Sequence, residues 1–153
     1  MSKLYVDEIH PKTAGGSVTI PNVPTDSSYF YAVRDAGHVT STNTIVFNLI
    51  VSNEGNDYDN TNGIYTAPVS GLYWFSNTFL HHSTASNDVE IRVDNSTVLG
   101  KHRSFTAENH NSSSWSGVTY LNAGQDVRCV CTNGSVYGIG TTPWTNFTGY
   151  LIR

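Results

Sequence analysis

The segment NGIYTAPVSGLYWF, at positions 62–75, constrains the fold of this chain more than any other part of the sequence. It ends one short run of strand-forming residues, turns through Pro68, and starts a second run at Gly71. Proline fixes the backbone of such a corner, and glycine lets the chain turn where a Cβ would collide. In the second run Tyr73 and Phe75 lie two residues apart, so their rings share one face of a strand. The segment predicts two strands joined by a tight corner, with an aromatic face that has to be buried.

Short runs of β-branched and aromatic residues recur along the chain, separated by clusters of glycine, asparagine and aspartate. Such clusters mark turns, and no stretch keeps a helical period for three turns. The strands that these runs predict are Tyr29–Arg34, Thr44–Val51, Gly63–Thr66, Gly71–Leu80, Asp88–Asp94, Ser114–Leu121, Gln125–Cys131 and Trp144–Arg153. Short strands at roughly ten-residue spacing favour an all-β sandwich or jelly roll.

The first 25 residues differ from the rest, so we divide the chain into an anchor, residues 1–25, and a head, residues 26–153. Two short alternating segments surround a Gly-Gly turn in the anchor, which predicts a hairpin or extended arms. A hairpin this short is not stable alone in water, so it has to dock on its own head, a neighbouring copy or another protein. The apolar residues that we expect to make this contact are Leu4, Val6, Ile9, Val18 and Ile20.

Charge and hydropathy exclude several classes of partner. Only 13% of residues are charged, and the formal net charge is −4. Nucleic-acid binding requires a clustered basic surface, so we expect no nucleic-acid partner. No apolar run reaches the length of a membrane span or of the apolar region of a signal peptide. We therefore expect no membrane span and a protein made in a cytoplasm.

The two cysteines and the histidines indicate neither a disulfide nor a metal site. Cys129 and Cys131 lie two residues apart on a predicted strand, where their separation of about 6.5–7 Å is too long for easy bridging. We expect two reduced cysteines in the core. His81 and His82 point to opposite faces of a strand, and other histidines follow in a region rich in serine and asparagine. We interpret the histidines, His102 and His110 included, as solvated loop residues.

The acidic residues give no catalytic pattern. Asp57 and Asp59 lie in a loop rich in asparagine and glycine, which leaves calcium binding open, although a polar turn is the favoured interpretation. No aspartate or glutamate lies in an apolar setting that would raise its pKa for acid–base catalysis. We expect no cofactor, no catalytic residue and no enzymatic activity.

Recognition by a β-scaffold is normally carried by its loops. The long polar stretches Ser83–Asn87 and Ser104–Ser114 are the candidates here. A carbohydrate site would place an exposed aromatic ring beside polar groups, with core packing as the alternative role for each ring. The aromatic residues that we consider for a ligand site are Tyr58, Trp115, Tyr137 and Trp144.

Beyond these patterns, residues 29–153 resemble the C1q globular-head family, which shares its jelly roll with the tumour-necrosis-factor superfamily. The residues that carry the resemblance are Phe47, Asn53, Tyr58, Tyr65, Gly71, Tyr73 and Phe75, with Phe147, Gly149 and Leu151 in the closing strand. The chain departs from the family pattern at Tyr65, where phenylalanine is usual, and at Asn77, where an aromatic residue is missing.

The resemblance implies a ten-stranded type of jelly roll that forms a homotrimer, binds partners and catalyses nothing. It also implies that several matched residues pack in the core or along the threefold axis. The residues assigned to this packing are Phe47, Tyr65, Gly71, Tyr73, Phe75, Phe147, Gly149 and Leu151.

The segment Leu4–Lys12 resembles the amino termini of small virion proteins of tailed phages, in particular cyanophage-like ones. This resemblance implies a phage virion protein, either a trimeric fibre or knob tip for host attachment or a capsid decoration protein. Such a protein would be located in the virion after synthesis in the host cytoplasm, and residues 1–25 would join it to other virion proteins. Its head would bind a host-surface glycan or protein. The alternative is a free secreted-type or bacterial C1q-like module that binds glycans or proteins through its loops.

Overall fold

The residues that the computed structural model describes are 27–40, 42–82, 86–104, 110–139 and 142–152 of the 153-residue chain. The predicted anchor, residues 1–25 with its apolar residues, lies outside the described residues. Its boundary with the head stays a prediction.

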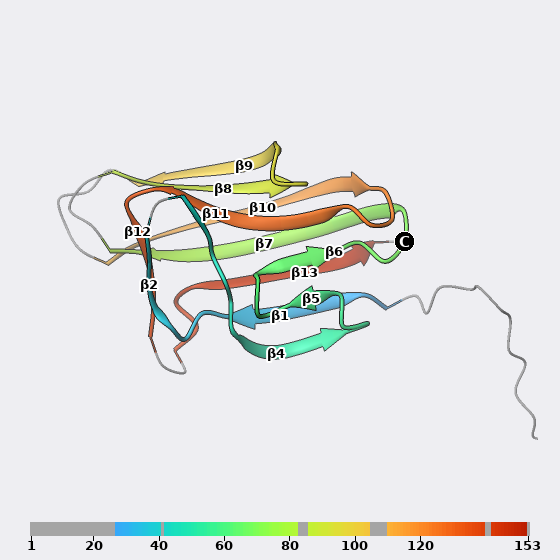
Figure 1. The fold of residues 1–153 in the computed structure, drawn as a ribbon, viewed down its shortest axis with the longest axis horizontal. Coiled ribbons are helices and arrows are strands. Elements are labelled where there is room, and N and C mark those ends of the chain that lie inside the picture. Colours follow the sequence, from blue (N-terminus) through green and yellow to red (C-terminus); the bar gives the residue numbers. More distant parts are fainter. Residues whose placement is uncertain (1–26, 41, 83–85, 105–109, 140–141, 153) are drawn as a thin grey trace, which may run out of the picture.

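Two antiparallel sheets stack face to face over the described part of the chain (Figure 1). The strands of the seven-stranded sheet are, in order, β2 (Gly37–Thr40), β12 (Ser135–Gly138), β7 (Gly71–His81), β13 (Asn146–Ile152), β1 (Tyr29–Val33) and β4 (Leu49–Glu54), with β10 (Asn111–Leu121) paired to β7. The strands of the six-stranded sheet are β5 (Tyr58–Asp59), β6 (Ile64–Thr66), β11 (Asp126–Asn133), β8 (Asn87–Val93) and β9 (Thr97–Ser104), with β3 (Asn43–Thr44) paired to β11. The described residues contain no helix, and the all-β jelly-roll prediction is confirmed.

Strand β7 is the centre of the seven-stranded sheet. It pairs with β10 along its whole length, with β13 over most of its residues, and with β12 at Leu80 and His81. β6 ends at Thr66 and β7 begins at Gly71, so the chain does turn through Pro68 as predicted. Backbone hydrogen bonds between Ala67 and the β10–β11 turn fix this corner.

The observed strands differ from the predicted ones where the chain changes sheets. A single strand was expected over Thr44–Val51, but β3 belongs to the six-stranded sheet and β4 to the seven-stranded one. Residues 45–48 cross between the sheets, which is why Ile45 and Phe47 are both fully buried although they lie outside a strand. The sequence also missed β2, β5, β9 and β12, whose short or polar runs give weak alternation.

Aromatic rings fill the space between the sheets. The rings of Phe30 and Phe147 meet edge to face with their centroids 4.9 Å apart, and Phe75 lies 5.9 Å from Phe147. Tyr65 of the opposite sheet contacts Phe75 at 5.5 Å. Rings of this size each bury on the order of 150–250 Å² and dominate the energetics of a core.

The residues predicted to pack are therefore inside one subunit. Of the predicted set, Phe47, Tyr65, Tyr73, Phe75 and Phe147 are all fully buried between the sheets. Their rings cannot also reach a neighbouring subunit, so a subunit interface has to use other side chains. Cys129 and Cys131 are likewise buried and unbridged, which confirms the prediction of two reduced core cysteines.

Gly149 and Gly71 allow this packing because they carry no side chain. A Cβ at Gly149 would overlap the rings of Phe75 and Phe30, and a Cβ at Gly71 would lie 2.9 Å from Leu151 Cδ1. The half-buried side chain of Leu151 packs against the core at this point.

We expect Gly149→Ala to lower the free energy of unfolding by about 1–3 kcal/mol, because the added methyl group forces two core rings apart. Urea unfolding at a fixed protein concentration measures the change. The control is Val98→Ala, on the exposed side of β9 in the other sheet, which should shift stability by no more than about 0.5 kcal/mol. Equal stability of wild type and Gly149→Ala would contradict the packing described here.

Candidate ligand-binding site

An open cavity of about 450 Å³ lies where strand β7 ends, at one end of the sandwich. The residues that line it are Leu80, His110, Tyr137, Ile139 and Trp144. This volume falls within the range of small-molecule sites, roughly 300–1,000 Å³. Leu80 is nearly buried, whereas about half of the surface of Ile139 and Trp144 is exposed. The cavity therefore has an apolar base and an aromatic rim that a ligand can reach.

Thr145 positions the rim. Its side chain is fully buried, and its Oγ1 donates to the carbonyl oxygen of Tyr137 at 2.5 Å while accepting from the backbone N–H of Leu80 at 2.9 Å. The backbone N–H of Trp144 donates to the carbonyl oxygen of Thr142 at 2.8 Å. One hydroxyl thus ties β7, β12 and the segment that carries Trp144 together.

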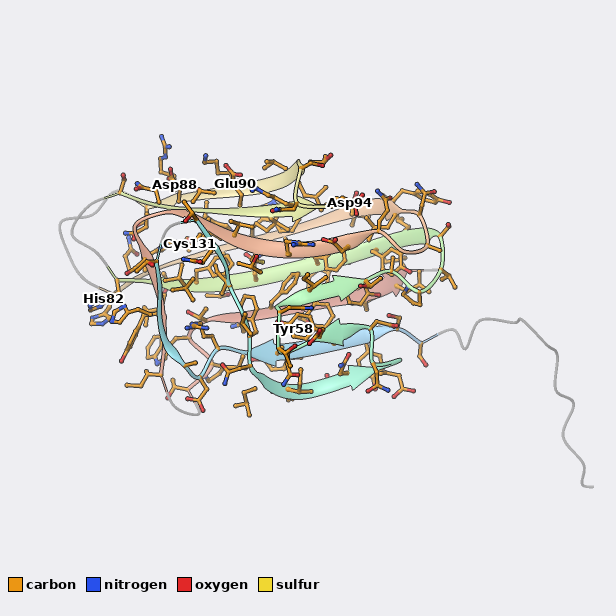
Figure 2. All side chains as sticks on the ribbon, viewed as in Figure 1. Tyr58, His82, Asp88, Glu90, Asp94 and Cys131 are labelled. Atoms are coloured by element: carbon orange, nitrogen blue, oxygen red, sulfur yellow. The ribbon has the colours of Figure 1, made fainter. Side chains whose placement is uncertain are left out.

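Three imidazoles and a phenol ring form the wall beside the cavity. His82 Nδ1 and His110 Nε2 are 2.9 Å apart and share one proton in a hydrogen bond. The ring centroid of His38 lies 4.5 Å from that of His82 and 4.6 Å from that of Tyr137. Partial burial, together with His38 and His110, lowers the pKa of His82. Figure 2 places His82 at the end of the sandwich where β7 terminates.

Two other histidines are buried, so their interpretation as solvated loop residues is wrong. His102 belongs to β9, and its Nε2 lies 2.8 Å from Asn77 Oδ1 in the core. His81 Nε2 lies 2.6 Å from Ser113 Oγ, and its Nδ1 is buried without a hydrogen-bond partner among the described residues. Burial lowers the pKa of both residues, in His102 to about 4. His81 and His82 do point to opposite faces of β7, as the sequence predicted.

Of the four aromatic candidates for a ligand site, Tyr58 and Trp115 pack within the protein, whereas Tyr137 and Trp144 line the cavity. Tyr58 is buried, and its hydroxyl accepts a hydrogen bond from the backbone N–H of Phe47 at 3.1 Å, so it belongs to the core. Trp115 is half-buried and covers Gly100 and Gly117, where any Cβ would collide with its ring. Tyr137 and Trp144 converge on the cavity.

Sequence reasoning did not place His110, Ile139 or Leu80 at this site. His110 has a positive φ of 68°, a backbone conformation that no sequence signal indicated. The clustering arises from strands that are far apart along the chain.

The two aspartates considered for calcium are engaged in local hydrogen bonds. Asp57 Oδ2 accepts from Ser28 Oγ at 2.6 Å, and Asp59 Oδ1 accepts from the backbone and side chain of Thr61. No cluster of three or more histidine, cysteine, aspartate or glutamate side chains in the described ranges is arranged to hold a metal ion. Calcium binding stays a prediction.

A separate apolar face covers the outer side of the seven-stranded sheet, near the start of β7. The residues that form this apolar face are Tyr29, Leu72, Trp74, Val118, Tyr120 and Tyr150. Val118, Trp74, Tyr150 and Tyr29 stand directly opposite one another across β10, β7, β13 and β1. A second cavity, of about 410 Å³, opens on the same side of the sheet beside Tyr29 and Tyr150.

None of the described segments forms a helix long and apolar enough to cross a membrane.

The comparisons with known proteins agree with this architecture. A family model described as the C1q domain matches residues 29–152. Complement C1q tumor necrosis factor-related protein 3 of Mus musculus is 27% identical over 132 residues, and its Homo sapiens counterpart is 27% identical over 138 residues. Each match covers 85% of this chain and 53% of the relative, so the chain spans about half the length of these curated relatives.

Solved structures show the same fold. The globular domain of zebrafish complement 1qA matches with a TM-score of 0.66 and 21% identity, covering 83% of this chain and 98% of the other. Eiger TNF from S. frugiperda matches with a TM-score of 0.65 and 12% identity, covering 83% and 92%. Murine APRIL at pH 5.0 matches with a TM-score of 0.62 and 14% identity, covering 82% and 99%.

These findings correct the expected location. The virion location is wrong, because the curated relatives are C1q tumor necrosis factor-related proteins of mouse and human. The phage role gains no support either, and the family match begins at residue 29, after the segment that suggested it.

We expect stability to fall between pH 6.5 and pH 4. His102 is neutral in the folded protein and has a folded pKa of about 4, against 6.5 for an unperturbed histidine, so the unfolded chain binds more protons in this window. Its contribution is complete above pH 6.5 and is lost as pH falls toward 4, by about 3 kcal/mol. His81, whose pKa is also lowered by burial, adds a loss in the same direction.

Urea unfolding at pH 7.0, 6.0, 5.0 and 4.5 measures this loss. His102→Gln retains an amide that can bond to Asn77 and cannot be protonated, so its stability should fall less steeply over this range. Val98→Ala, an exposed substitution on β9 that removes no titratable group, serves as the control. A pH dependence that is identical in His102→Gln and wild type would refute the assignment.

Proposed function

The chain belongs to the C1q domain family, and from that premise we propose that it is an extracellular, homotrimeric recognition module that binds glycan or protein ligands. Domains of the C1q and tumour-necrosis-factor families form homotrimers and are generally non-enzymatic binding modules. The observation that carries the proposal for this chain is the cavity rimmed by Tyr137 and Trp144 at the end of a rigid sandwich. Loops and strand ends on such a scaffold are where recognition normally occurs.

The similarity to C1q tumor necrosis factor-related proteins of mouse and human supports an extracellular location, because proteins of this group are secreted. Because this chain spans only about half of the mouse and human proteins, nothing in their remaining length is transferred to it.

The apolar face supports the homotrimer. A monomer would leave Tyr120 and Val118 more than half exposed, together with the row of rings across β7 and β13. Contiguous apolar surface of this kind marks an association site, and a closed threefold assembly covers it on every subunit. The subunit contact is thus assigned to side chains on the outer side of the sheet, while the predicted packing residues fill the core.

A hydrolase is the competing class, because Ser113 and His81 are hydrogen-bonded as a nucleophile and a base would be. Within the described part of the chain no residue orients the base, since His81 Nδ1 has no hydrogen-bond partner there. Asp88, the nearby carboxylate, is held by Arg103 through two bonds of 2.7 Å. Ser113 lines neither of the two cavities described above. These contacts favour a structural role for the pair.

We expect Val118→Glu to convert the trimer into monomers, because the substitution places three carboxylates in the buried contact. Sedimentation equilibrium gives the mass of each species. Val98→Glu is the matched control: Val98 is exposed to a similar degree, 48% against 53%, but lies on β9 in the other sheet. Trimers that persist in Val118→Glu, or that are lost equally in Val98→Glu, would place the subunit contact elsewhere.

Ligand binding is tested by applying the purified full chain to arrays of glycans and of extracellular proteins. We expect binding to a restricted set of spots, at least about 100-fold weaker in the Val118→Glu monomer because a trimer engages several sites at once. The Val98→Glu variant should bind as the wild type does. Absence of binding on both arrays, or reproducible turnover of an ester or glycoside, would reject the recognition function.

A further inference from the structure

The cavity at the end of β7 combines flat apolar surface with polar atoms that have no partner in the described part of the chain. About half of the indole surface of Trp144 is exposed, and the Tyr137 ring stands across the same cavity. Neither the Tyr137 hydroxyl nor Trp144 Nε1 forms a hydrogen bond with another described residue. Within the described ranges His110 forms a hydrogen bond only through Nε2, to His82, which leaves its Nδ1 available to a ligand.

The walls of the cavity are held in place before any ligand arrives. His110 is hydrogen-bonded to His82, and the rings of His38 and His82 pack against Tyr137 at 4.6 Å and 5.4 Å. Thr145 fixes the backbone of Tyr137 and Leu80 from below. Side chains immobilised in this way lose little conformational freedom on binding, which favours a small ligand that binds by its shape.

The described lining of the cavity offers no charged partner for an ionic ligand. Among the residues that the structure describes, its lining consists of Leu80, Ile139, an indole, a phenol and one imidazole, and none of these carries a carboxylate, an ammonium or a guanidinium group. A neutral ligand is therefore the best match.

The polar atoms of the rim favour a ligand that carries hydroxyl groups, because hydroxyls can form hydrogen bonds with them. An aliphatic or aromatic side chain of a protein partner would cover the Tyr137 hydroxyl, Trp144 Nε1 and His110 Nδ1 without bonding to them, and leaving such groups unpaired is costly. A sugar ring has C–H groups on its faces and hydroxyls around its edge, so it can stack on an aromatic ring and bond to these atoms simultaneously.

We propose that the Trp144–Tyr137–His110 cavity binds a neutral pyranose ring at the exposed end of a glycan. This inference rests on the proposed recognition function and assigns a ligand class to one site of it. The ring stacks against Trp144, and its hydroxyls bond to Tyr137 Oη and His110 Nδ1. Thr145 is a positioning residue that does not touch the sugar.

The test uses the full chain and the methyl glycosides of glucose, galactose, mannose and N-acetylglucosamine in saturation-transfer NMR. We expect at least one glycoside to bind with its ring C–H protons receiving most of the saturation. Trp144→Ala should weaken this binding about tenfold, and Trp144→Phe should restore part of it, since a smaller ring still stacks. Tyr137→Phe, which removes only the hydroxyl, should weaken it less. Val98→Ala, on β9 of the six-stranded sheet, is the control and should have no effect.

Each variant is first checked for trimer mass and thermal midpoint, so that loss of the fold is recognised. Methoxycyclohexane, which has the ring size but no hydroxyls, is the matched compound. If it binds as tightly as the best glycoside, the occupant is an apolar side chain of a protein and the proposal is wrong. Failure of all four glycosides, or binding that Trp144→Ala leaves unchanged, also overturns it.

The array experiment separates this failure from failure of the recognition function. If the array ligands bind Trp144→Ala as tightly as they bind the wild type, the recognition function is retained but the cavity is not the site that carries it. Absence of both array binding and glycoside binding would reject both.

Discussion

The contact of Phe30, Phe75 and Phe147 between the sheets is the interaction on which the other features depend. It requires a residue without a side chain at Gly149, and it sets the register of β13 against β1 and β7. Since side chains alternate along a strand, burying Phe75 and Phe147 directs Trp74 and Tyr150 to the opposite side. One core contact thereby determines both the interior and the apolar face through which subunits are proposed to meet.

The alternation of residues was sufficient to predict the β class and the strands near β7 and β8, because that pattern is local. It failed at residues 45–48, where a run of apolar residues crosses between sheets, and at His81 and His102. Their burial depends on Ser113 and Asn77, which lie 32 and 25 residues away along the chain, and no local pattern carries that information. The candidate site was predicted in part for the same reason. Tyr137 and Trp144 were among the four aromatic residues considered for a ligand site, whereas their meeting with His110 arises only from the pairing of β7 with β12 and β10.

The two surfaces to which we assign function lie at opposite ends of β7. The apolar face lies over Leu72 and Trp74 near its start, and the cavity is built on Leu80 near its end. An assembly formed through the first surface leaves the second accessible on every copy. In the proposed trimer this separation would multiply the affinity of a weak site without covering it, which is the physical advantage of a multivalent binding protein.

The position of β13 has a consequence for how the molecule folds. This strand lies between β1 and β7, and Thr148 bonds to Phe30 across 118 residues of sequence. Until nearly all of the described chain is available, the seven-stranded sheet therefore stays open. The edges of β1 and β7 that pair with β13 are then without a partner. Closing so long a loop is entropically costly and slow, and open strand edges are sites of aggregation in the meantime. The edge strands β2 and β9 carry few large apolar side chains, which made them hard to recognise in the sequence and makes edge-to-edge association at these two strands less favourable.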